Sequence, residues 1–115
     1  TTREDEGNLE IVSFNIERFK LFSRGYLEET YEILNDVERE HLVDAITSMA
    51  LEYGIRHVTD YLDGDKKFKI DHKTQNWDIC KNQFKLVEDI ELHYGELKTI
   101  INNTYHEIKN EKQAL

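Results

Sequence analysis

The chain of 115 residues contains no proline, and its five glycines stand apart at positions 7, 25, 54, 64 and 95. A fold of many strands needs frequent turns, which proline and glycine commonly supply, whereas long helices form well without them. Apolar residues recur at intervals of three and four along most of the sequence, which is typical of one buried helix face. The sequence therefore predicts an all-α fold, an antiparallel helical bundle.

Two helix boundaries carry recognisable chemistry. Asn35 followed by Glu38 has the spacing of a capping box at a helix N-terminus. Asp63-Gly64-Asp65 has the residue types of a turn and ends the helix before it. Asn76 is expected to cap the next helix. The predicted helical tracts cover about residues 14–31, 35–62, 76–94 and 97–108.

Charge and cysteine content limit the partners and the compartment. The net charge is −9, with 24 acidic against 15 basic residues, which argues against binding a nucleic-acid backbone. The lone Cys80 allows no internal disulfide and fits a reducing compartment. No apolar run approaches the roughly 18 residues of a membrane span. We therefore expect a cytoplasmic protein with neither nucleic acid nor membrane as partner.

Motifs for catalysis, metal binding or nucleotide binding are absent from the sequence. It contains no Gly-x-Ser-x-Gly and no glycine-rich phosphate loop, and Cys80 falls on an apolar helix face, as a buried thiol would. Asp60, Asp63 and Asp65 form an acidic cluster, but their spacing does not match a calcium loop. We expect no catalytic, cofactor-binding or metal-ligating residue in this chain.

Arg56 is open to two interpretations. It stands four residues before Asp60, so the two side chains could form an ion pair on the helix surface, worth a few tenths of a kcal/mol. Alternatively, the guanidinium could border a pocket and offer its fixed donors to a hydroxyl-rich or anionic ligand.

Two segments resemble a known family. GIRHVTDYLDGDKKFKI at residues 54–70 is similar to a Gly-Ile-Arg-Phe-Leu-Thr-Asp-Tyr-Leu-Asn-Gly-Asp-Val-Tyr-Phe-Lys run of sugar kinases in the aminoglycoside phosphotransferase-like family, the N-acetylhexosamine kinases and their relatives. QNWDICKNQFKLVEDIE at residues 75–91 is similar to the helix that follows it. The resemblance covers residues 1–94, whereas residues 95–115 form a helical tail without a counterpart.

The resemblance implies a protein-kinase-like fold in which residues 1–94 form the far helical portion of the C-lobe. Such enzymes use ATP and Mg²⁺ to phosphorylate a sugar hydroxyl. Their catalytic-loop and Mg²⁺-binding aspartate motifs do not occur in this chain, so catalysis is expected to need an N-terminal kinase portion. The family's sugar-contacting arginine falls on Arg56, and a tyrosine at its sugar pocket falls on Lys67. Asp60, Gly64 and Asp65 match the family and are expected to hold the helix end.

A second hypothesis needs no enzyme. The chain could be a stand-alone helical module that binds another protein, with the amphipathic tail at residues 95–115 pairing with a partner helix. A helical piece of a larger lobe would also expose a former interface, so self-association is expected in either case.

Overall fold

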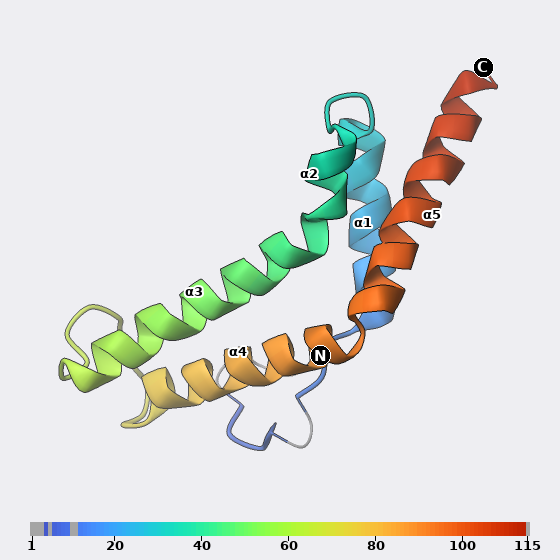
Figure 1. Ribbon diagram of the computed structural model, residues 1–115. Helices are drawn as coiled ribbons and strands as arrows, with labels where there is room; N and C mark the ends of the chain where they lie inside the picture. Colours follow the sequence, from blue (N-terminus) through green and yellow to red (C-terminus); the bar gives the residue numbers. More distant parts are fainter. Residues whose placement is uncertain (1–3, 5, 10–11, 115) are drawn as a thin grey trace. The chain divides into compact units, whose positions relative to one another are not determined.

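The computed structural model describes residue 4, residues 6–9 and residues 12–114. Five helices form in these ranges: α1 Ile16–Thr30, α2 Asp36–Glu40, α3 Leu42–Leu62, α4 Gln75–Leu92 and α5 Tyr94–Gln113 (Figure 1). No strand occurs in the described ranges, so the predicted all-α class is confirmed for them. None of these helices combines the length and the apolar character that crossing a bilayer requires.

The chain divides into two compact units. Unit 1 combines residues 1–14 with residues 46–92, and unit 2 combines residues 15–45 with residues 93–115. Each unit therefore joins segments that are distant in sequence. The division falls inside α3 and between α4 and α5.

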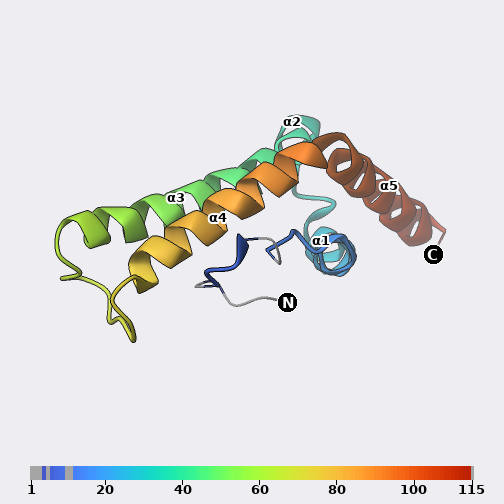
Figure 2. The same cartoon turned by 90° about the horizontal axis from the view of Figure 1, so that it is seen from below.

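Unit 1 is built on α4 and the larger part of α3, which run antiparallel side by side (Figures 1 and 2). The two helices approach closely at Gly54, where an added Cβ would lie 2.9 Å from the Phe84 ring. Trp77 on α4 stacks against Tyr61 on α3, with ring centroids 6.2 Å apart. Buried core residues of this unit include Ile79, Cys80, Val87 and Ile90.

Cys80 is 1% exposed, as its place on an apolar helix face predicted. Burial raises the pKa of its thiol, since the thiolate would lose its hydration. The side chain therefore acts as a small core residue.

Unit 2 packs α1 against α5, and the two helices run in the same direction (Figure 1). Their buried side chains include Leu27, Leu97, Ile101 and Ile108. The predicted antiparallel arrangement thus holds for α3 and α4 but not for α1 and α5. A short hairpin connection fixes the direction of neighbouring helices, but α1 and α5 are separated by three other helices.

The capping box at the start of α2 is confirmed. Asn35 Oδ1 accepts a hydrogen bond from the Glu38 backbone N–H at 2.8 Å, and Glu38 Oε1 accepts one from the Asn35 N–H at 3.0 Å. Both partners lie within one turn, so this contact depends on local sequence alone.

The single helix expected over residues 35–62 is interrupted at His41, where the backbone leaves the helical region with φ −101° and ψ 11°. The interruption separates α2 from α3. The side chains that precede it are held by α5: the Arg39 guanidinium lies 3.8 Å from the centre of the Tyr105 ring, and Glu40 pairs with Lys98. Contacts with a distant helix thus accompany the break, and no proline or glycine marks it.

Candidate functional site

The C-terminus of α3 is closed by a Schellman motif. The Asp65 N–H donates to the Asp60 carbonyl at 2.8 Å, and the Gly64 N–H donates to the Tyr61 carbonyl at 3.2 Å. Gly64 has φ +95° and Asp65 has φ +60°, both in the left-handed region. Glycine tolerates this region without a steric penalty, so the turn predicted for Asp63-Gly64-Asp65 is confirmed.

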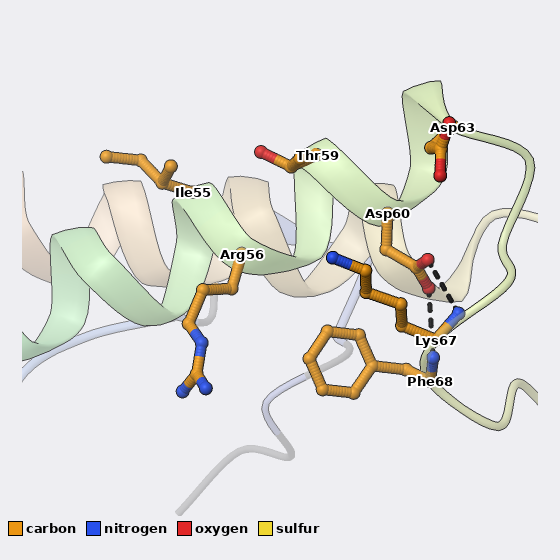
Figure 3. Close-up of a pocket in the computed structure, with 7 residues that line it drawn as sticks. All are labelled: Ile55, Arg56, Thr59, Asp60, Asp63, Lys67 and Phe68. Atoms are coloured by element: carbon orange, nitrogen blue, oxygen red, sulfur yellow. Dashed lines mark hydrogen bonds between the residues drawn. The ribbon is translucent and has the colours of Figure 1, made fainter.

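One buried carboxylate organises the loop after this turn. Asp60 is 1% exposed and accepts hydrogen bonds from the backbone N–H groups of Lys66, Lys67 and Phe68 at 2.9, 2.8 and 3.1 Å. Asn76 Nδ2 donates a fourth bond to it at 2.9 Å. Figure 3 shows two of the backbone bonds. Asp60 therefore fixes the backbone from which the Lys67 and Phe68 side chains extend.

These bonds also decide the charge of Asp60. Burial alone would raise its pKa, but the hydrogen bonds from Phe68, Lys67, Asn76 and Lys66 outweigh burial and lower the pKa below the ordinary value. The carboxylate is thus ionised at neutral pH, and its charge is compensated by four donors.

Asn76 was expected as a helix cap, and this prediction is wrong. It is the second residue of α4, and its buried side chain points into the loop. Its Nδ2 donates to Asp65 Oδ1 at 2.9 Å as well as to Asp60, which leaves Oδ1 as the acceptor for His57 Nδ1 at 2.7 Å. Asn76 thus joins α3, α4 and the turn.

His57 lies behind the loop. It is buried, its ring stacks on Phe68 with centroids 4.1 Å apart, and it meets the Tyr53 ring edge-on at 4.6 Å. The ring Nδ1 is hydrogen-bonded to Asn76 Oδ1, whereas Nε2 has no hydrogen-bond partner in the part of the chain that the structure describes. The ring thus supports Phe68 from the interior.

The loop and α3 enclose a hollow of about 240 Å³ on the surface of unit 1 (Figure 3). The structure brings both predicted substrate-binding residues, Arg56 and Lys67, to this hollow. The Lys67 side chain extends back along α3, and the Phe68 ring lies beside it (Figure 3). The lining residues are Ile55, Arg56, Thr59, Asp60, Asp63, Lys67 and Phe68.

Arg56 does not pair with Asp60, because the Asp60 carboxylate is occupied by the loop. Among the described residues it forms an ion pair with Glu52, with 4.0 Å between Nη1 and Oε1, and its side chain is 64% exposed. The ammonium of Lys67 has no hydrogen-bond or ion-pair partner among the residues described. Lys67 therefore has no counter-charge of its own among these residues, whereas Arg56 makes a long, exposed ion pair with Glu52.

The three aspartates of the acidic cluster have separate roles. Asp60 anchors the loop, Asp65 accepts from Asn76, and Asp63 is exposed at the rim of the hollow. The anchoring role expected for Asp60 agrees with these contacts. The sequence did not indicate that the side chains of His57 and Asn76 would bond to each other behind the loop, and the aromatic wall made by Phe68 was not expected either.

No protein-family model matches the chain. The similarity of residues 54–70 and 75–91 to sugar kinases stays a prediction, as does the boundary at residue 94 that it implies.

Proposed function

We propose that this chain is the substrate-side helical portion of an ATP-dependent sugar phosphotransferase of the cytoplasm. In this function Arg56 orients the acceptor sugar, and a kinase portion outside these 115 residues supplies the catalytic aspartates and the binding of ATP and Mg²⁺. The sequence resemblance of residues 54–70 and 75–91 supports the proposal. In the family that these two segments resemble, the matching segments belong to the far helical part of a kinase-like C-lobe.

The observation that carries the proposal is the chemistry of the hollow. Arg56 and Lys67 offer donors, Asp63 offers acceptors and Thr59 offers a hydroxyl, while Phe68 provides an aromatic face. A sugar presents hydroxyl groups around its ring and apolar C–H groups on its faces. The polar side chains of the hollow can bond to the hydroxyl groups, and the Phe68 ring can pack against the C–H groups. A few polar groups placed around an apolar wall are typical of small-molecule sites.

Orientation is the task that this chain would perform. Phosphoryl transfer depends mostly on positioning and on charge stabilisation, so a group that holds the acceptor contributes without touching the phosphate. Asp60 keeps the Lys67 and Phe68 backbone fixed relative to α3, the helix that carries Arg56. The hollow is thus held in one arrangement before a ligand enters.

The test is an assay of the complete gene product with ATP, Mg²⁺ and a panel of hexoses and hexosamines. Arg56→Ala should raise the KM for the sugar about tenfold or more, with a smaller change in kcat, because it removes ground-state binding. Arg18→Ala, at an exposed arginine of α1, is the matched control. Failure to phosphorylate any sugar, or equal kinetics for the two variants, would contradict the proposal.

A second candidate is a helical module that binds proteins. The observation in its favour is the outer face of α1, where Leu21 is 75% and Phe22 67% exposed, and where the Phe22 and Tyr26 rings stack at 6.2 Å. Large apolar side chains gathered on an exposed helix are common at protein interfaces. Concentration-dependent mass without phosphotransfer would favour this candidate over the enzyme.

A further inference from the structure

We propose that α1 is a self-association surface, and that its exposed face packs against the same face of a second copy of this chain with the two helices antiparallel. The inference goes beyond the proposed function and does not depend on it, since no residue of α1 lines the hollow at Arg56. It assigns one partner, a second copy, to the apolar side chains that are exposed on this helix.

The exposed face of α1 consists of two neighbouring rows of side chains, and within each row the residues are four positions apart. Such residues lie next to each other along a helix surface. The first row is Arg18, Phe22 and Tyr26, and the second row is Leu21, Gly25 and Glu29. All six positions are exposed, whereas the buried positions of α1 lie on the side that faces away from these rows: Phe19, Ser23 and Leu27. The two rows are therefore open to a partner.

The two rows differ in height. In the first row the Phe22 and Tyr26 rings stack with centroids 6.2 Å apart and form a ridge. In the second row Gly25 leaves a gap, because a Cβ built there has nothing within 4 Å. Helices pack with the ridge of one in the groove of the other. In an antiparallel pair, Phe22 enters the gap at Gly25 of the second copy, and Tyr26 meets its Leu21.

The charges at the two ends of the face match the same arrangement. Arg18 stands near the start of α1 and Glu29 near its end, so antiparallel packing puts each beside the other residue of the second copy. Other charges of this helix are paired within the chain: Lys20 with Glu17 at 3.4 Å and Arg24 with Glu28 at 2.9 Å. Arg18 and Glu29 form no ion pair among the described residues. A parallel pair would bring like charges together at both ends.

These contacts point to a second copy instead of an unrelated protein. Three pairs lie symmetrically about the middle of α1, between residues 23 and 24: Arg18 with Glu29, Leu21 with Tyr26 and Phe22 with Gly25. A two-fold axis at that point exchanges the two rows and forms every contact twice, which is the property of an interface between identical subunits. A different partner gives no reason for this self-complementarity. One pair of short helices buries less than the roughly 1,200 Å² of a standard interface, so the association is expected to be weak and reversible.

Reversal of the two charges tests the arrangement, with sedimentation equilibrium of the complete gene product as the measurement. Arg18→Glu and Glu29→Arg should each weaken association about tenfold, because two attractive pairs become two repulsive ones. A chain that carries both substitutions should associate like the wild type, and so should an equimolar mixture of the two single variants. Net charge cannot explain this pattern, because the first substitution makes an acidic chain more acidic and the second makes it less acidic.

A variant at Gly25 tests the ridge and the gap. Gly25→Gln should weaken association about tenfold or more, because its side chain occupies the space that Phe22 of the second copy enters. The same substitution should leave folding intact or improve it, since the position is exposed, nothing lies within 4 Å of the added Cβ and glutamine has a higher helix propensity than glycine. Thermal unfolding followed by circular dichroism checks this. Lys20→Gln, at an exposed position of α1 outside the two rows, is the control and should leave association unchanged.

A wild type that stays monomeric at all concentrations overturns the inference. Association that both single charge variants retain, or that Gly25→Gln leaves unchanged, also overturns it, because the α1 faces then do not meet in this arrangement. A monomer that uses Phe22 to bind a different protein overturns it as well. Sugar phosphorylation is measured separately, and its absence in a protein that associates as described contradicts the proposed function alone.

Discussion

Among single residues, Asn76 has a side chain that contacts three separate segments: it bonds to Asp60, Asp65 and His57. Asn76→Ala would leave a buried carboxylate and a buried imidazole short of partners. We expect the free energy of unfolding to fall by about 2–3 kcal/mol. Urea titration followed by circular dichroism measures the change.

The control for this variant is Asn103→Ala, at an exposed position of α5. That substitution should change the free energy of unfolding by less than about 0.5 kcal/mol. Equal effects of the two variants would mean that the network around Asn76 contributes little.

The lowered pKa of Asp60 makes stability depend on pH. The folded protein holds the carboxylate ionised more strongly than the unfolded chain does, so the contribution is fully present above the ordinary value of 3.8. It is lost as pH falls through that value toward the lower pKa of the folded state. Urea titrations between pH 7 and pH 3 should show a smaller loss of stability in Asp60→Asn than in the wild type. Parallel curves for the two proteins would contradict this assignment.

The residues of the hollow show what the sequence can and cannot predict. The family resemblance named Arg56 and Lys67, and both side chains line one hollow. Their role in binding a substrate stays a prediction. The pairing of Arg56 with Asp60 was wrong, since helical spacing cannot reveal that three backbone N–H groups compete for the same carboxylate. His57 and Asn76 meet only after the loop closes, and no local pattern marks that contact.

At the level of helices, two glycines allow a direct comparison. Gly25 lies inside α1 with open space around it, so Gly25→Ala should stabilise the protein by about 0.5–1 kcal/mol through helix propensity. Gly54 faces α4, where a new Cβ would lie 2.9 Å from the Phe84 ring and 3.3 Å from Gln83 Cβ. Gly54→Ala should therefore gain nothing or lose stability, as thermal unfolding can measure. An equal gain at both positions would mean that α3 and α4 pack less closely.

Helix boundaries followed the sequence where they depend on local bonds. The Asn35–Glu38 capping box and the turn after Leu62 are both made within a few residues, and both were predicted correctly. The interruption at His41 was not predicted. It accompanies contacts between α2 and α5, helices whose proximity no local pattern specifies.

For the whole molecule, exposed apolar area predicts self-association. Replacing Leu21 and Phe22 together by lysine should remove it, because both side chains lie on the exposed face of α1. The weight-average mass from sedimentation equilibrium should rise with concentration in the wild type and stay at the monomer value in the double variant. Leu92→Lys, at an exposed leucine of unit 1, should behave as the wild type. A wild type that is monomeric at all concentrations would contradict the prediction.

The sequence pattern did not predict the division into two units, because each unit joins segments from different parts of the chain. Periodicity identifies which residues a helix buries but does not say which other helix covers them.

Trp77 gives this division a practical use. It is the only tryptophan of the chain, and it lies in unit 1, where its ring stacks against Tyr61. Its fluorescence emission therefore reports on unit 1 and carries no signal from unit 2, whereas backbone ellipticity averages over both. Unfolding curves from the two signals that coincide would indicate one cooperative transition, and curves that separate would give each unit its own midpoint.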